Sequence, residues 1–159
     1  MKRKKLYKNI DCHIRQKIDK LIDNGYEQSA LGTIDNDNLP FVTKVIPISF
    51  QNKVYILLSD LSEHTRNITA NPVASLYFAA QEEHKTKSNN ARLTLQGRLT
   101  KLLLNKKEQE FNQILEKYAK IDVGSELWAH FDDFNFYEFY EKRRLYIEGF
   151  AKAYEEINY

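Results

Sequence analysis

The chain has 159 residues, of which 42% are hydrophobic and 29% are charged, and its net charge at pH 7 is +2. We expect a single domain over residues 1–159, because this length and composition are typical of one folded unit with a normal core. So small a net charge gives no general attraction to nucleic acid. A single cysteine, Cys12, excludes an intramolecular disulfide and a cysteine-rich metal site.

The N-terminus shows no targeting pattern. The basic segment Met1–Lys5 is not followed by an apolar run, so we expect no secretory signal. No apolar stretch is long enough to cross a bilayer. We therefore expect a soluble, cytoplasmic protein that partners neither nucleic acid nor membrane.

The first element is predicted to be an amphipathic helix over about residues 10–24. Ile10, Ile14, Ile18 and Leu21 recur at steps of three and four residues. Asn24-Gly25 follows, and asparagine and glycine commonly end a helix.

Six or seven antiparallel strands are expected within about residues 28–153. Turn-rich residues 35–38 separate two β-prone segments and predict a hairpin, and residues 51–53 predict another. Residues 92–100 show the most regular alternation of polar and apolar side chains. The remaining strands are expected over 29–34, 39–46, 54–58 and 73–80, with 132–140 and 144–153 as a closing hairpin.

Two further helices complete the expected fold. Ser62 is placed as the N-cap of a short helix that Asn71-Pro72 ends. Residues 106–119 carry apolar side chains on one face, which is typical of an amphipathic helix. Antiparallel strands with flanking helices favour an α+β fold built on a small β-barrel.

The strand-to-helix segment Ser59–Asn67 holds the most chemistry. The free amides and the dipole of a helix start favour an anion. Thr65 adds a hydroxyl and Arg66 a permanent charge suited to phosphate. His64 is either a donor to phosphate, an acid–base group facing haem or a surface residue. The alternative is a capped helix with an exposed arginine.

Two cations on other strands add to this segment. Lys44 shares an apolar row with Val42, Ile46 and Ile48, so its ammonium either meets an anion or reaches water. Arg92 opens the regular strand on its polar face. If barrel closure brings these groups together, a phosphate-bearing cofactor is the expected ligand.

Other chemistries have weaker signals. The chain has no glycine-rich phosphate loop, and its four histidines are not spaced as a zinc set, so no metal site is expected. Asp132-Asp133 is either a paired-carboxylate site or a solvated acidic turn. The aromatic residues between Phe131 and Tyr140 either stack on a planar ligand or form a buried strand with a dimer contact.

The ordered motifs resemble the pyridoxamine 5'-phosphate oxidase-like split-barrel superfamily, and its haem-utilisation branch most closely. The resemblance covers roughly residues 29–153. It rests on Ala30-Leu31-Gly32-Thr33-Ile34, Pro40-Phe41-Val42-Thr43, Leu58-Ser59, His64-Thr65-Arg66-Asn67, Asn71-Pro72, Arg92-Leu93-Thr94-Leu95-Gln96-Gly97, Asp133-Phe134 and Gly149-Phe150-Ala151-Lys152-Ala153.

This resemblance implies a six-stranded, Greek-key, FMN-binding split barrel that forms a homodimer with its cofactor at the subunit interface. It implies that His64 and Asp133 form a polar pair across the dimer, which makes them the candidates for catalysis. The cofactor-binding positions it implies are Lys44, Ser59, His64, Thr65 and Arg66 near the phosphate, and Arg92 facing the flavin ring.

Two functions follow as hypotheses. The leading one is an FMN-dependent oxidoreductase acting on a small-molecule substrate. Ser62-Glu63-His64 replaces the Ser-Arg-Lys cluster of the oxidases, so pyridoxamine phosphate itself is not the expected substrate. The alternative is a haem-binding, haem-degrading or haem-storage protein without flavin chemistry. No histidine follows His130, so the C-terminal haem ligand of the haem-degrading members has no expected counterpart. A dimeric barrel that has lost its ligand is the third reading.

Overall fold

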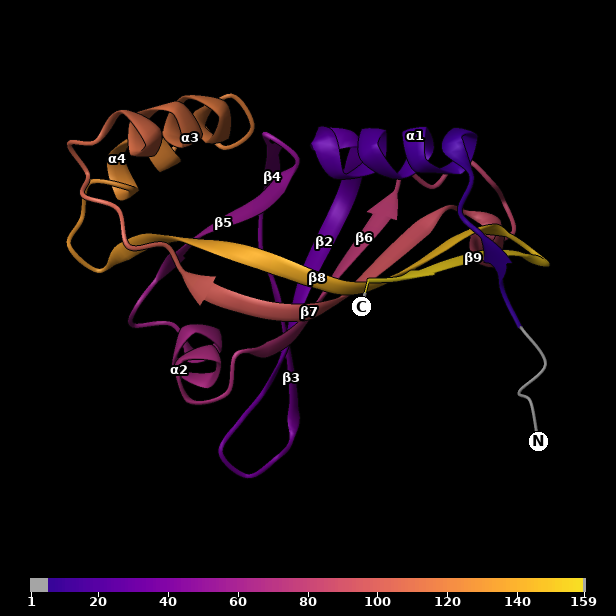
Figure 1. Cartoon of the computed structure of the whole chain (residues 1–159), viewed down its shortest axis with the longest axis horizontal. Coiled ribbons are helices and arrows are strands. Elements are labelled where there is room, and N and C mark those ends of the chain that lie inside the picture. The colour runs from indigo at the N-terminus through magenta and orange to yellow at the C-terminus, as the bar shows by residue number, and fades with distance from the viewer. Residues whose placement is uncertain (1–5, 159) are drawn as a thin grey trace.

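The computed structural model describes residues 6–158, and the basic segment Met1–Lys5 lies outside them. A largely antiparallel sheet forms the centre of the molecule, with helices on two sides (Figure 1). The predicted α+β class is confirmed. The sheet runs in the order β1 (Lys8–Asn9), β9 (Lys152–Ile157), β8 (Phe134–Gly149), β7 (Arg92–Lys101), β6 (Val73–Ala80), β2 (Tyr26–Ile34) and β3 (Pro40–Lys44), with β5 (Lys53–Ser59) also on β8 and β4 (Pro47–Phe50) on β5.

Strand β8 connects the two halves of the sheet. Its first half pairs with β5 and its second half with β9, while β7 pairs along most of its length. The predicted closing hairpin within residues 132–153 is therefore wrong. Residues 141–143, which separate the two expected strands, continue one strand, and the chain reverses at Phe150-Ala151 instead. There Ala151 adopts a φ of 59°.

Strand β5 is buried on both faces because it lies between two hydrophobic cores. Ile56 and Leu58 belong to the larger core inside the barrel, and Tyr55 and Leu57 to a smaller one on the other face. This double burial explains why β5 has five successive apolar residues, 54–58, of which the last four are buried. It also fixes the end of β5, from which the candidate site begins.

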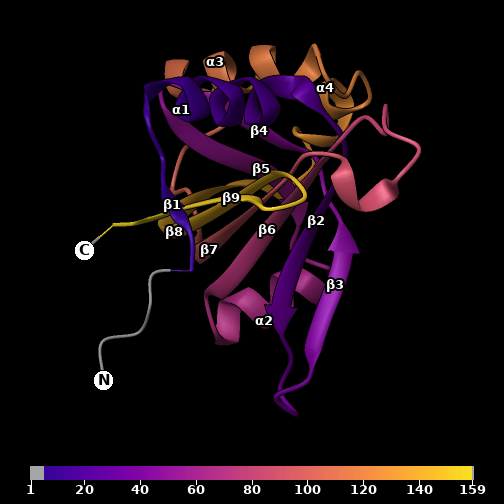
Figure 2. The same cartoon turned by 90° about the vertical axis from the view of Figure 1, so that its right-hand side faces the viewer.

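Two helices cover the same side of the sheet (Figure 2). Helix α1 (Cys12–Lys20) continues as a π-helical turn, η1 (Leu21–Gly25), and closes the larger core, which confirms the predicted N-terminal helix. Helix α3 (Gln109–Ala119) packs Phe111 and Ile114 onto the smaller core. It begins three residues later than predicted.

The remaining helices are short. Helix α2 (Glu63–Ala70) lies on the opposite side of the sheet from α1 and α3 (Figures 1 and 2). Helix α4 (Ser125–Trp128) follows α3, and a 3-10 turn, η2 (Lys87–Asn89), lies in the loop before β7.

Within residues 6–158, none of the helices has the length and hydropathy that a membrane span requires.

Candidate functional site

The end of β5 is tied to the start of β8 by a pair of side chains. Ser59, the last residue of β5, donates its hydroxyl to Asp133 at 2.5 Å. The backbone N–H of Leu61 donates to the same hydroxyl at 3.2 Å. Asp133 is thus not a residue of a purely solvated acidic turn, because its carboxylate fixes the junction that leads into α2.

Asp60, the next residue, receives three side-chain hydrogen bonds. Its Oδ2 accepts from Lys101 at 2.9 Å and from Asn135 at 3.1 Å, and its Oδ1 accepts from Tyr137 at 3.0 Å. Burial alone would raise the pKa of the Asp60 carboxyl, but the bonds from Lys101, Tyr137 and Asn135 outweigh it and lower that pKa. Asp60 was not predicted, because the sequence shows it only as an acidic residue in a turn after a buried strand.

Helix α2 begins as predicted, yet without the predicted side-chain cap. Ser62 occupies the N-cap with extended backbone, but its hydroxyl makes no capping bond. Its carbonyl accepts from the N–H groups of Thr65 and Arg66, both at 3.1 Å. Farther along, Asn67 donates to the Thr33 hydroxyl at 3.0 Å, and both side chains are buried. The helix is therefore fixed by the turn before it and by Asn67.

His64 lines a small hollow of about 190 Å³, named here the His64 hollow. Its Nε2 is buried and has no hydrogen-bond partner among the described residues. Burial lowers the pKa of the imidazole, so His64 is neutral at pH 7. Trp128 and Phe134 line the same hollow, with ring centroids 6.5 Å apart. Trp128 was not predicted, and its only signal was its place shortly before the aromatic-rich residues 131–140.

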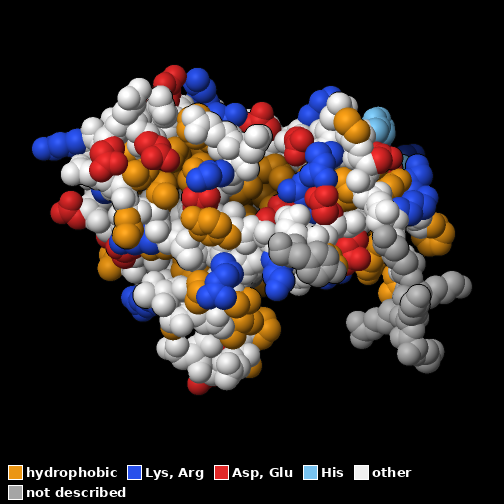
Figure 3. All heavy atoms as spheres, viewed as in Figure 1, with side chains coloured by type: hydrophobic (Ala, Val, Ile, Leu, Met, Phe, Trp, Pro, Cys, Tyr) orange, Lys and Arg blue, Asp and Glu red, His pale blue; other side chains and the backbone are white. Residues whose placement is uncertain are grey.

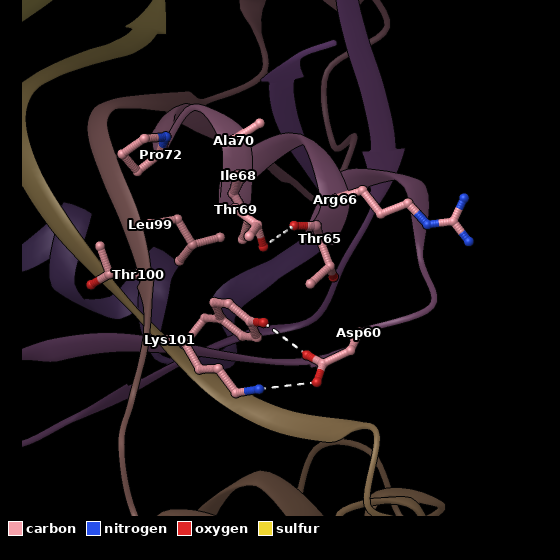
Figure 4. Close-up of a pocket in the computed structure, with 11 residues that line it drawn as sticks. Asp60, Thr65, Arg66, Ile68, Thr69, Ala70, Pro72, Leu99, Thr100 and Lys101 are labelled. Carbon is pink, nitrogen blue, oxygen red and sulfur yellow. Dashed lines mark hydrogen bonds and ion pairs between the residues drawn. The ribbon is translucent and has the colours of Figure 1, made fainter. Parts of the chain in front are cut away.

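A second and larger hollow, of about 790 Å³, is lined by Arg66 and is named here the Arg66 hollow (Figure 4). Figure 4 shows the Arg66 guanidinium extending away from Asp60 and Lys101. It makes no hydrogen bond or ion pair within residues 6–158. Thr65 also lines this hollow, and its buried Oγ1 lacks a partner in the described chain. Leu99 and Ile68 supply an apolar wall.

The predicted cofactor residues divide among three places. Lys44, Ser59 and His64 line the His64 hollow, whereas Thr65 and Arg66 line the Arg66 hollow. Arg92 begins β7, at the opposite end of that strand from Lys101, and donates to the carbonyls of Ser88 and Asn90. One chain alone therefore does not gather the five residues expected near the phosphate into one hollow, and it places Arg92 apart from both hollows.

Lys44 does not occupy the apolar row expected for it. Strand β3 ends at Lys44, whose side chain is exposed, while Ile48 belongs to β4 and is fully buried. The expectation assumed one continuous strand, but the chain leaves β3 after Lys44. The ammonium is consequently open to solvent at the mouth of the His64 hollow.

A third hollow, of about 820 Å³, lies between α1 and β8. Figure 3 shows acidic and basic side chains interspersed on this face. Arg144 pairs with Glu141 at 2.5 Å, and Lys53 with the buried Glu138 at 3.2 Å. Its charges are mutually compensated, so it has no clear ligand preference. Among residues 6–158, His, Cys, Asp and Glu side chains form no group of three or more that could hold a metal ion.

Known proteins share this sequence pattern and this fold. The chain is 23% identical over 129 residues to Heme oxygenase HutZ of Vibrio cholerae serotype O1, covering 79% of the chain and 71% of that protein. It is 32% identical over 101 residues to Non-canonical heme oxygenase HOZ, chloroplastic, of Arabidopsis thaliana, covering 62% of the chain but only 28% of that protein.

A solved structure of a heme binding protein from Mycobacterium smegmatis superposes with a TM-score of 0.76 at 18% identity. The match covers 87% of this chain and 56% of that one, so the chain spans about half of that structure. At this identity the likeness is one of fold alone. Residues 29–157 match the family described as CREG, beta-barrel. The chain therefore belongs to the CREG beta-barrel family.

Proposed function

We propose that this protein binds haem beside His64 and serves in haem utilisation. The observation that carries the proposal is the buried Nε2 of His64, which lacks a partner within the described chain. A buried polar atom without a partner costs roughly 1–3 kcal/mol, which a ligand contacting it would offset. Similarity to two proteins named as heme oxygenases supports haem over flavin.

The residues of the His64 hollow suit haem. A neutral imidazole is the form that contacts haem iron or donates to a group bound there. Trp128, Phe134 and Leu57 supply the apolar and aromatic surface that a porphyrin ring requires. The exposed ammonium of Lys44 at the mouth suits a propionate. When bound, the haem would supply redox chemistry, while the chain would orient it and exclude water.

The size of the His64 hollow requires a second surface. Ligand sites typically enclose about 300–1,000 Å³, and this hollow holds only about 190 Å³. A homodimer with its site at the subunit interface would supply the missing wall. It would also give Arg92 of a second copy a route to the site that Arg92 of the same chain lacks.

One face of the sheet suits that dimer. Val42 is 69% and Tyr77 40% exposed, and both project from the same face. Their neighbours on β2, Gly32 and Ala30, are small enough to allow close approach. Exposed apolar surface of this kind marks interaction sites.

The proposed dimer is tested by its mass in solution. Light scattering should give twice the chain mass, and Tyr77→Glu should give the mass of one chain. A wild-type monomer would refute the dimer.

FMN binding is the second candidate, and the Arg66 hollow favours it. Both oxygens of Asp60 are occupied by donors, whereas the Arg66 guanidinium has no partner within residues 6–158. Such a hollow has donors in excess and suits a phosphate. Arg66→Ala should then weaken FMN much more than riboflavin, which lacks the phosphate. Equal losses would argue against a phosphate contact by Arg66.

Parallel titrations with haem and FMN, followed by absorbance, test the proposed function. We expect a saturable Soret band with haem at micromolar protein and no comparable binding of FMN. Tight FMN binding without saturable haem binding would replace the haem proposal by the flavin one. If neither haem nor FMN binds, both the haem proposal and the flavin proposal are refuted.

A further inference from the structure

Asp60 is the first residue of the three-residue segment 60–62, which connects β5 to α2. Its backbone N–H donates to the carbonyl of Asp133 at 2.7 Å, which extends the β5–β8 contact one residue beyond Ser59. The chain then passes through Leu61 and Ser62 and enters the first turn of α2, where His64 is found. A change in the Asp60 turn therefore alters the entry of α2 directly.

The Asp60 side chain holds this turn to two strands. Lys101 comes from β7, while Asn135 and Tyr137 come from β8. Figure 4 shows the Lys101 ammonium reaching the Asp60 carboxylate below α2. Hydrogen bonds to an ionised acceptor are the stronger kind. The Asp60 carboxylate thus fixes the turn through three hydrogen bonds from two strands.

Apart from Asp60, the turn before α2 is held through Ser59, which accepts from the N–H groups of Leu61 and Ser62. The first turn of the helix itself has few side-chain bonds, because Ser62 gives no side-chain cap and the Nε2 of His64 has no partner among the described residues. The second turn is held independently, because Asn67 binds Thr33 and Ile68 enters the larger core. Loss of the Asp60 contacts should therefore loosen the beginning of the helix and leave its end in place.

We propose that Asp60 is a positioning residue, which holds the first turn of α2 so that His64 faces the His64 hollow in a single orientation. It does not touch the ligand itself. Its effect on haem rests on the proposed function, whereas its effect on α2 does not. The two effects are therefore measured separately.

The experiment uses Asp60→Ala, Asp60→Asn and the control Asp35→Ala. Asp35 is matched because it also holds a turn, accepting from the N–H groups of Asp37 and Leu39 between β2 and β3. Hydrogen exchange without haem should be about tenfold faster over residues 61–65 in Asp60→Ala, with residues 109–119 unchanged. Asp60→Asn, which keeps an acceptor for Tyr137, should show a smaller increase.

The same variants are then titrated with haem. Asp60→Ala should bind haem at least about tenfold more weakly and with an altered Soret band, while Asp35→Ala matches the wild type. Unchanged exchange at residues 61–65, or an equal change in Asp35→Ala, would overturn the role of Asp60. If wild type fails to bind haem, the proposed function fails and exchange alone decides on Asp60. If Asp60→Ala does not fold, Tyr137→Phe, which removes one hydroxyl, must show the same local increase.

Discussion

Ser59 and Asp133 are 74 residues apart in sequence, and the hydroxyl of one donates to the carboxylate of the other at 2.5 Å. The bond joins the last residue of β5 to the residue before β8. It stands at the wall of the His64 hollow, which Ser59 and Phe134 both line. The strand junction and the candidate site are thus one structure.

Ser59→Ala should lower stability by about 1.5–3 kcal/mol, because a partly buried carboxylate loses a hydrogen-bond donor. For a chain of this size, about 2–4 °C of melting temperature corresponds to each kcal/mol. Thermal melts check this, with Ser88→Ala as the control, since the Ser88 hydroxyl has no bond in the described structure. Equal melting temperatures for both variants would show that the Ser59 bond contributes nothing.

Asn67→Ala should cost about 1–3 kcal/mol, because it leaves the buried Thr33 hydroxyl without its partner. Adding Thr33→Val removes that unsatisfied hydroxyl, so the double variant should be no less stable than Asn67→Ala alone. Denaturant unfolding of the four proteins of this cycle measures the coupling. Strict additivity would mean that the two side chains do not interact.

Gly97→Ala should destabilise the barrel by about 1–3 kcal/mol. Gly97 lies at the bulge in β7, and a Cβ there would be 2.0 Å from the carbonyl oxygen of Tyr140. Gly149 is the control, because the nearest atom to a Cβ at that position is 3.4 Å away. If both alanine variants have the melting temperature of wild type, β7 and β8 can move apart at Gly97 without loss of stability, which would contradict this prediction.

Acid should destabilise the wild type in part through His64. Burial lowers the pKa of the folded imidazole, so the unfolded chain binds a proton first as the pH falls. This preferential protonation of the unfolded chain destabilises the folded protein. The destabilisation is absent above the ordinary histidine pKa of about 6.5 and grows as the pH falls from there towards the pKa of the folded state. His64→Gln should therefore lose less melting temperature between pH 7.5 and pH 5 than wild type. An equal or larger loss would mean that His64 is freely protonated when folded.

Sequence patterns located most elements because their apolar side chains repeat at the period of the element. The period of β7 and the apolar faces of α1 and α3 are clear examples. The length of β8 was missed, since the charged residues 141–143 separate two strand-like segments and the bond from Arg143 to Glu155 on β9 cannot be read from the sequence. That bond joins two different strands, so it leaves no local signal in the sequence.

The candidate site was likewise predicted only where local residue types define it. The segment around His64 and Arg66 was recognised from its residue types. Its division between two hollows depends on which way each side chain leaves α2, and no spacing rule predicts that for a single short helix. Asp60 was overlooked because its three donors come from strands about 40 and 75 residues away in sequence.

Haem titration of wild type, His64→Ala and His13→Ala is the most direct test of the central claim. His13 lies exposed on α1, away from both hollows, and is the matched control. We predict a saturable Soret band in wild type and His13→Ala, with binding at least about tenfold weaker in His64→Ala. Identical haem affinity and identical spectra in all three proteins would contradict the proposed haem site.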